Sequence, residues 1–513
     1  MKTPTVPKEL IEQVVARVAP FAEEVKKQVP GWAAVRDAVG FRSMELDVQA
    51  KARELADDIT ETVLRWIAGD EAFEEDASVA CRATSHDRVR HGGRRETQVT
   101  LLGGKQVRLS AQYLKPNLRR ERTAKRVSAK RPRNRKGRRP GIFPLLAALG
   151  IWFGVTPALA GEVCRQVSDS DSVRTGRAAL ERRGIRLGHE RTLRIVNETA
   201  GRAVSQRNTW LRSMRTGEPI AGALAGKRVV VALDGGRLRE RVPKRRGPRR
   251  KSGHRGYDAP WREPKQLVIY VIDNRTGNVD ATFAPVYDAT LGDCDAIFEM
   301  LVAYLKALGA HQASRLIVVG DGAPWIWDRA DRLAKDVGIA NSKLRQVVDW
   351  YHAVETLHEI AGIPRWADKL RDSWIRRAKN ALHAGDIDRV AALIDDIAVG
   401  RNAKKISSHR DYFVRNTKRM QYASFKHQHI PCGSGAVEST VRRVVNQRLK
   451  APGTFWLEHN AEGVLLLRSY LKAGRFDDLI DWSLLSAAFW WVPGPKPRDL
   501  TRGPLLHADR ADL

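Results

Sequence analysis

Two aspartates in this sequence each end a short apolar run, and each is followed by glycine. Asp234 follows residues 229–233, and Asp321 follows residues 316–319 and one glycine. Apolar runs of this length that stop at a turn predict strands buried on both faces of a sheet. Either aspartate alone fits a turn former or a helix cap better than a catalytic group. Together they indicate two carboxylates at neighbouring strand ends.

A glutamate much later in the chain supplies a third carboxylate. Glu438 stands in the segment Gly-Ser-Gly-Ala-Val-Glu-Ser, residues 433–439, where Ser434 is suited to cap a helix that continues to about Leu449. On that helix Glu438 and Arg442 share one stripe, so an exposed ion pair is the structural alternative. The flanking glycines permit close approach of a nucleic acid and favour the functional interpretation.

Three carboxylates at one edge of a sheet suit metal-dependent phosphodiester chemistry. Hard Mg²⁺ (or Mn²⁺) prefers oxygen ligands, and two ions roughly 4 Å apart can activate an attacking oxygen and stabilise a leaving one. We therefore predict that Asp234, Asp321 and Glu438 are the catalytic residues and the ligands of two metal ions. The secondary candidates near this edge are Asp349, His352 and Arg442.

The elements that must position these acids can be predicted from the apolar pattern. It predicts the order β-β-β-α-β-α-β, a mixed sheet covered by helices. The expected strands are 228–233, 267–272, 281–287, 316–319 and 345–348, and the expected helices are 293–308 and 324–337. Residues 353–430 are mainly helix formers and predict an all-helical segment before the glutamate.

The amino-terminal part predicts helices and one hairpin. Amphipathic helices are expected at 9–29 and 44–67, and alternating apolar residues around a Gly-Gly pair predict a hairpin over 99–113. Several short helices follow between 142 and 200.

Those short helices fit a helix-turn-helix module or an ordinary helical bundle about equally well, because the module has no strict local motif. In the first case Arg191 and Arg194 would lie on the outward face of a helix over 190–203, where a recognition helix needs hydrogen-bond donors.

The charge of the chain indicates a polyanionic partner. Ninety lysines and arginines oppose 59 acids, which gives a formal net charge of +31. The excess is clustered: residues 115–139 hold thirteen basic residues and one acid, and residues 237–255 hold ten and one. Such density favours contact with DNA phosphates. The basic residues expected to bind DNA in these two segments are Arg131, Arg133, Arg135, Lys136, Arg138, Arg139, Lys244, Arg245, Arg246, Arg249, Arg250 and Lys251.

Other classes of protein are disfavoured. No run of about 18 apolar residues is present, so a membrane partner is not expected. The first 18 residues lack the pattern of a secretory signal, which predicts a cytoplasmic protein. The four cysteines are widely separated and form no C-x-x-C pair, which argues against a disulfide framework and a structural zinc site.

These motifs resemble those of the DDE transposases of bacterial insertion sequences, with the Kra-type group the most similar. The resemblance covers roughly residues 229–482. It is carried by Leu-Asp-Gly-Gly at 233–236, Gly-Asp-Gly-Ala-Pro-Trp-Ile at 320–326, Asp-Trp-Tyr-His at 349–352 and the segment 433–439. Relatives often carry cysteine pairs after the amino-terminal hairpin, whereas residues 113–116 here hold none, so zinc is not expected.

The resemblance implies a fold, an activity and partners. The fold class would be α/β, with an RNase H-like core interrupted by an all-helical insertion and preceded by a mainly helical DNA-binding region with a hairpin. The chain would act on double-stranded DNA, both transposon ends and target, as a homodimer or higher oligomer associated with the bacterial nucleoid. A nuclease on a similar core that does not join strands and an inactive DNA-binding regulator are the alternatives.

The expected organisation has six parts. These are an amino-terminal helical and hairpin domain (1–114), a basic linker (115–140), a helix-turn-helix-like domain (141–225), the catalytic core (226–352 and 431–482), the helical insertion (353–430) and a carboxy-terminal tail (483–513).

Overall fold

The computed structural model describes residues 7–84, 89–116, 141–244, 246, 248 and 256–485 of the chain. The chain divides into two compact units, the first made mainly of residues up to Thr199 and the second running from Ala200 to Trp482. The division falls inside the long helix α7 (His189–Thr216). It is coarser than the six expected ranges, which stay predictions.

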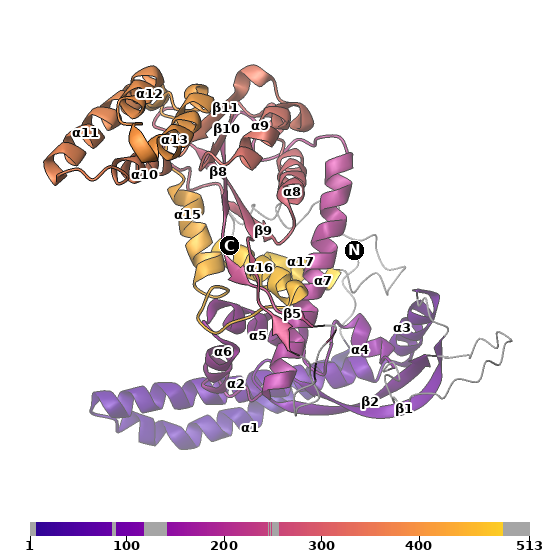
Figure 1. The fold of residues 1–513 in the computed structure, drawn as a ribbon. Coiled ribbons are helices and arrows are strands. Elements are labelled where there is room, and N and C mark those ends of the chain that lie inside the picture. Colours follow the sequence, from indigo (N-terminus) through magenta and orange to yellow (C-terminus); the bar gives the residue numbers. More distant parts are fainter. Residues whose placement is uncertain are drawn as a thin grey trace. The chain divides into compact units, whose positions relative to one another are not determined.

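The first unit combines helices with one hairpin (Figure 1). Its helices are α1 (Lys8–Ala33), α2 (Ala38–Ala68), α3 (Glu71–Thr84), α4 (Pro144–Ala148), α5 (Pro157–Asp169) and α6 (Val173–Glu181). The antiparallel strands β1 (Val89–Thr100) and β2 (Gln106–Pro116) form the predicted hairpin. Leu64 of α2, Leu101, Leu109 and Leu145 are buried in one apolar cluster between them.

Helix α3 was not predicted from the sequence. Its buried positions are Glu74, Ala77, Ser78, Ala80 and Cys81, small or polar residues that leave little apolar periodicity to read. Glu74 is accommodated because it accepts a hydrogen bond from the main chain of the hairpin, Gln112 N to Oε1 at 2.8 Å.

The second unit is built on a mixed five-stranded sheet in the order β11-β10-β3-β8-β9. The strands are β3 (Arg228–Gly235), β8 (Lys265–Ile272), β9 (Val286–Thr290), β10 (Arg315–Gly320) and β11 (Leu344–Val348). Strands β3, β10 and β11 are parallel to one another, and β8 is antiparallel to both β3 and β9. The fold class is therefore α/β, as expected, with the predicted order of strands and helices.

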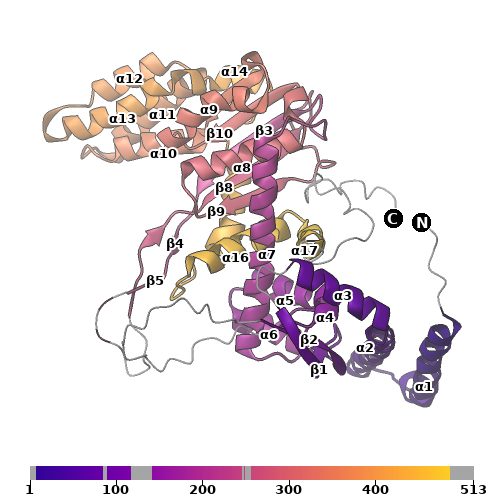
Figure 2. The same ribbon diagram turned by 90° about the vertical axis from the view of Figure 1, so that its right-hand side faces the viewer.

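Helices complete this unit. Helix α8 (Cys294–Ala307) follows β9, and α9 (Pro324–Val337) joins β10 to β11. The helices α10 (Trp350–Ala361), α11 (Asp368–Ala384), α12 (Ile387–Asp395), α13 (Ala403–Arg415) and α14 (Tyr422–His427) then form one lobe, visible in Figures 1 and 2. Helices α15 (Gly435–Val441), α16 (Glu458–Lys472) and α17 (Phe476–Leu485) end the described chain. The stretch 353–430 contains no strand among these described elements, as its composition predicts.

The third strand starts later than predicted. It was expected over 281–287 and runs over Val286–Thr290 instead. Asp280 accepts hydrogen bonds from the main-chain N–H of Thr282 at 3.0 Å and from its hydroxyl, which holds these residues in a turn.

The helix that carries Glu438 is shorter than predicted. Helix α15 ends at Val441 and gives way to a π-helical turn over Arg442–Asn446. Buried Arg468 of α16 explains this change, because its guanidinium donates to the main-chain oxygens of Val444, at 2.7 Å, and Arg443. A side chain that takes carbonyls from the helical ladder interrupts it. A spacing of four residues beyond Arg442, which would place Asn446 on the stripe of Glu438 and Arg442, is therefore lost in the π turn.

None of the helices in the described part of the chain combines the length and the apolar character needed to cross a lipid bilayer.

Candidate active site

The first two acids lie at the same edge of the sheet. Asp234 is near the carboxyl end of β3, and Asp321 directly follows β10. The two strands are parallel neighbours with Ala232 opposite Val319, so both strands reach this edge side by side. Each carboxylate also accepts a local main-chain hydrogen bond, Asp234 from Gly235 N at 2.6 Å and Asp321 from Ala323 N at 3.0 Å.

Glycine is needed where the chain turns after Asp321. Gly322 has φ = 83°, and a Cβ there would lie 2.5 Å from the ring of Tyr412. A larger residue would be strained and would clash, so glycine lets Tyr412 of the helical lobe cover this strand end. The Tyr412 hydroxyl lies 3.5 Å from the main-chain oxygen of Asp321.

The third acid reaches the same edge from α15. The pKa of Asp234 is raised to about 6, first by burial and then by the negative charges of Asp321 and Glu438, while the charge of His352 lowers it. A main-chain hydrogen bond from Gly235 also lowers it. Because both other acids act on Asp234, Asp321 and Glu438 each lie within electrostatic range of this carboxylate.

Glu438 is held by two polar neighbours. The Ser434 hydroxyl donates to Glu438 Oε1 at 2.8 Å, so this serine binds the acid and does not cap the helix with its side chain as predicted. His352 Nε2 lies 3.9 Å from the same oxygen, and its Nδ1 lies 3.3 Å from Glu355 Oε2. Arg442 is exposed, and no ion pair joins it to Glu438 among the described residues.

Asp349 connects the strand edge to the segment that carries Glu438. Its side chain is fully buried; one oxygen accepts from the main-chain N–H of Tyr351 at 2.5 Å and of His352 at 3.1 Å, which caps α10. The other oxygen accepts from Ser434 N. The neighbouring Trp350 N donates to Cys432 O at 2.8 Å. Asp349, predicted as a secondary candidate near this edge, thus caps a helix and also binds the segment that carries Glu438.

The donors suit a hard divalent cation. Asp234, Asp321 and Glu438 offer only oxygen, the ligand that Mg²⁺ and Mn²⁺ prefer, and a cation among them would relieve the repulsion that raises the Asp234 pKa. Within the residues that the structure describes, no three histidine, cysteine, aspartate or glutamate side chains converge at metal-binding distances as they stand. The acids would have to draw closer around an ion.

In the sequence between β3 and β8, the chain forms a two-stranded extension of this edge, which we call the arm. It consists of β4 (Leu238–Arg239) paired with β7 (Trp261–Arg262) and β5 (Val242–Pro243) paired with β6 (Tyr257–Asp258). The segment around Trp456 is tied to it, since Arg241 N donates to Trp456 O at 2.7 Å.

Arginines and aromatic rings stack along the arm. The guanidinium of Arg239 lies 4.8 Å from the ring centre of Trp261, and that of Arg241 lies 4.6 Å from Tyr257. Tyr257 in turn contacts Phe455 at 5.4 Å between ring centres. The sequence analysis placed these arginines in a basic segment expected to contact DNA but did not single them out or predict their aromatic partners, although Arg237, Arg239 and Arg241 alternate at the two-residue spacing of one strand face.

Most of the basic residues expected to bind DNA cannot be placed. Arg131, Arg133, Arg135, Lys136, Arg138, Arg139, Arg245, Arg249, Arg250 and Lys251 lie outside the described residues. Lys244 and Arg246 of the arm are exposed, and Lys244 Nζ lies 3.0 Å from Asp258.

Arg191 differs from the expectation, whereas Arg194 agrees with it. Arg194 is exposed. Arg191 is half-buried, and its guanidinium donates to Gly154 O at 2.7 Å and to Thr100 Oγ1 at 3.1 Å. Because these donors are used within the first unit, the prediction that Arg191 faces outward is wrong.

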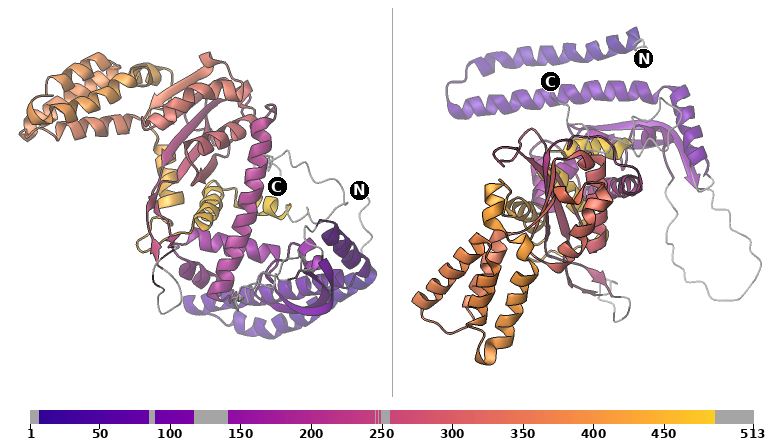
Figure 3. Two further views of the ribbon diagram at one scale, coloured as in Figure 1. Left: turned by 45° about the vertical axis from the view of Figure 1, so that its right-hand side comes forward. Right: turned by 90° about the horizontal axis from the view of Figure 1, so that it is seen from above.

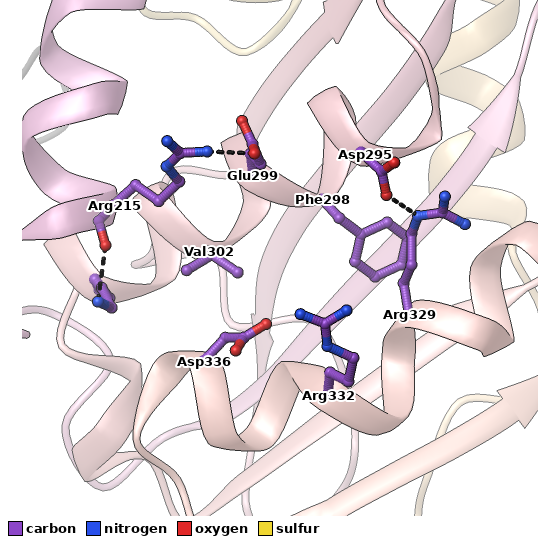
Figure 4. A pocket seen from close by; sticks show the side chains of 9 residues that line it. Arg215, Asp295, Phe298, Glu299, Val302, Arg329, Arg332 and Asp336 are labelled. Carbon is purple, nitrogen blue, oxygen red and sulfur yellow. Dashed lines mark hydrogen bonds and ion pairs between the residues drawn. The ribbon is translucent and has the colours of Figure 1, made fainter.

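A well-formed hollow of the second unit lies away from the three acids. It has a volume of about 580 Å³ and is lined by residues of α7, α8 and α9 (Figure 4). Most of its charges are already paired, Arg215 with Glu299 and Arg329 with Asp295 at 2.6 Å. None of the three acids lines it, so the candidate active site is an open edge and not this hollow.

No protein-family model, no curated protein and no solved structure matches this chain.

Proposed function

We propose that this chain is a DDE-type DNA transposase, which cuts transposon ends and joins them to target DNA. One observation carries the proposal: Asp234 and Asp321 stand at the ends of adjacent parallel strands, and Glu438 is near enough that its charge raises the Asp234 pKa. Three distant acids brought to one sheet edge are the arrangement that metal-dependent phosphodiester chemistry requires.

The topology supports the RNase H-like part of the proposal. Along the chain, the first three strands of this sheet are β3, β8 and β9, and each pairs with the next. Strands β10 and β11 extend the sheet on the other side of β3. Only β8 runs against the other strands. An all-helical lobe between β11 and α15 corresponds to the insertion that the sequence resemblance implies.

In the proposed reaction, water attacks a phosphodiester at a transposon end, which breaks the P–O3′ bond and leaves a 3′-hydroxyl and a 5′-phosphate. The freed 3′-hydroxyl then attacks a target phosphodiester, forms a new P–O bond and displaces the 3′-oxygen of the target strand, with no covalent bond to the protein. Asp234, Asp321 and Glu438 would hold the divalent ions. When bound, such ions polarise the attacking oxygen and neutralise charge on the leaving one. The chain's own residues orient the acids: Ser434 holds Glu438 by a hydrogen bond, Asp349 holds Ser434, and His352 lies beside Glu438.

The test is an assay for cut and joined DNA. The purified chain is incubated with Mg²⁺, a plasmid target and labelled duplexes from the DNA that flanks its gene. Glu438→Gln is expected to lower cleavage by on the order of 1000-fold while end binding is retained, since losing a group that stabilises developing charge costs about that much. Glu359→Gln, an exposed position on α10, is the matched control.

The outcomes separate the alternatives. Cut products that are never joined would support a nuclease instead. Sequence-specific binding without any metal-dependent cutting would support a DNA-binding regulator. Full cleavage by Glu438→Gln would refute the assignment of this glutamate.

A further inference from the structure

Helix α1 has little to hold it in place. It lies along α2, as Figure 3 shows, with Arg17 Nε donating to Thr62 at 3.2 Å and Trp32 Nε1 to Asp47 at 3.1 Å. None of the residues in this helix of 26 residues is buried. An amphipathic helix in a folded protein ordinarily derives most of its stability from burying one face, whereas the residues of α1 that face α2, such as Leu10, Val14 and Phe21, are only half-buried.

A second apolar stripe on α1 lies beside the face that contacts α2. Its members are Ile11, Val15, Val18, Ala22, Val25 and Val29. At 100° per residue they lie about a quarter of a turn from the positions that contact α2. Ile11 is 51% exposed, Val15 60%, Val18 40% and Val29 47%, whereas Val25 is half-buried.

The spacing of this stripe is that of a coiled-coil seam. Its steps of four, three, four, three and four residues repeat the a and d positions of a heptad. Pro20, which interrupts the hydrogen bonds of the helix, lies on the opposite side from the stripe and does not obstruct it.

We propose that α1 forms an antiparallel two-stranded coiled coil with the α1 helix of a second copy of this chain. In the register that is symmetric about the middle of the stripe, Ile11 faces Val29 of the partner subunit, and Val15 faces Val25 of the partner subunit. Every seam residue then has an aliphatic counterpart, as an interface with two-fold symmetry requires.

The charges beside the seam select the antiparallel direction. Glu12 and Lys26 occupy the e positions, and e positions face each other in an antiparallel pair. Glu12 therefore meets Lys26 of the partner subunit, twice in the dimer. In a parallel pair Lys26 would meet Phe21 of the partner subunit, and the charges would have no counterpart. Within the single chain each makes only a long exposed contact, Lys8 to Glu12 at 3.7 Å and Glu23 to Lys26 at 3.8 Å.

Charge reversal tests this pairing. The full chain, without DNA or metal, is studied by sedimentation equilibrium as Glu12→Lys, as Lys26→Glu and as the double variant. Each single variant is expected to raise the dimer dissociation constant by roughly fivefold to thirtyfold, because two attractive pairs become repulsive. The double variant exchanges the charges and is expected to restore the original dissociation constant.

Two controls make the result specific. Glu9→Lys and Lys27→Glu change the same charges on exposed positions away from the seam and are expected to leave the dissociation constant unchanged. Val18→Asp places a charge in the seam and is expected to give a monomer with unchanged helix content by circular dichroism.

The inference is overturned if the wild-type chain is monomeric throughout, if the double variant fails to restore dimerisation, or if Val18→Asp leaves the dimer intact. It also stands apart from the proposed function. A chain that dimerises through α1 and neither cuts nor joins DNA would retain the inference and lose the transposase proposal. If both hold, one dimer supplies the two active sites for a pair of DNA ends.

Discussion

The energetic cost of bringing the three acids together falls mainly on Asp234. Burial and the charges of Asp321 and Glu438 raise the pKa of its carboxyl to about 6, from an ordinary value of 3.8. The folded state therefore favours the protonated form, and in the absence of metal, ionisation destabilises the fold as the pH rises from about 4 through 6. The loss is complete above that range.

Asp234→Asn removes this ionisation and should stabilise the metal-free protein. With EDTA present, we expect the free energy of unfolding to rise by about 1 to 3 kcal/mol at pH 8, because a shift of about two pKa units corresponds to at most roughly 3 kcal/mol. The gain should vanish near pH 4. Thermal unfolding from pH 4 to 8 measures it, with exposed Asp336→Asn as control. A gain independent of pH would contradict this origin, and Mg²⁺ should stabilise only the wild type.

Asp349 is predicted to be a positioning residue. In Asp349→Asn one oxygen can still cap α10, but the amide nitrogen would face the Ser434 N–H, and two donors would oppose each other. We expect a loss of about 1 to 3 kcal/mol in stability, the usual cost of an unsatisfied buried donor. The Mg²⁺ concentration for half-maximal cleavage should rise, because Glu438 is less well held.

Two measurements distinguish positioning from a general loss of stability. Hydrogen exchange at the Ser434 amide should become faster in Asp349→Asn, while exchange in β3 and β10 stays slow. Ser434→Ala removes only the 2.8 Å hydrogen bond to Glu438 and should raise the Mg²⁺ requirement without that large loss of stability. An unchanged Mg²⁺ requirement in both variants would contradict the role given to Asp349.

Among the elements, the arm is the one whose chemistry extends beyond the metal site. Arg239 lies over the ring of Trp261 and Arg241 over that of Tyr257, and a guanidinium that packs on an aromatic face can still donate hydrogen bonds from its edge. Planar donors held in this way are suited to phosphate oxygens, and they read no base sequence. We therefore predict that the arm contributes to DNA binding near the site and not to the chemistry itself.

The double variant Arg239→Gln/Arg241→Gln tests the arm. We expect affinity for a duplex of arbitrary sequence to fall about tenfold or more and the slope of log K against log salt to decrease by about 1.8, since each phosphate contact contributes roughly 0.9. The corresponding lysine variant should keep the slope but lose affinity, because it retains charge without stacking. Exposed Arg275→Gln, in the turn after β8, is the control. Equal slopes in the wild type and the glutamine variant would exclude phosphate contacts by these arginines.

At the scale of the whole molecule, we expect the net charge of +31 to dominate association with DNA. If the chain neutralises six to ten phosphates, non-specific affinity for duplex DNA should fall by about 10³ to 10⁵ between 50 and 200 mM salt. Fluorescence anisotropy with a duplex of arbitrary sequence measures this dependence. A decrease of less than tenfold would mean that the basic clusters mainly serve solubility and do not contact DNA.

Local pattern was enough to predict the five strands of the main sheet and the helices α8 and α9. The apolar runs before Asp234 and Asp321 predicted buried strands, and the order of strands and helices up to β11 follows that prediction. Such features depend on residues close together in the chain, because strand runs, caps and turns are decided within about ten residues. The late start of β9 and the unpredicted α3 show where this prediction fails. At both places, polar contacts of a side chain, Asp280 and Glu74, override the apolar pattern.

Tertiary structure alone decided how distant segments meet. Nothing near Glu438 in the sequence indicates that its charge reaches Asp234, that Asp349 binds Ser434, or that Arg468 breaks the helix into a π turn. Arg191 likewise fits an outward position in the sequence pattern, but in the structure its guanidinium donates to the main-chain oxygen of Gly154. These contacts join residues far apart in the chain, and they exist only after strands pair and helices pack. The residue types for the chemistry are therefore local information, whereas their convergence on one sheet edge is a property of the folded chain.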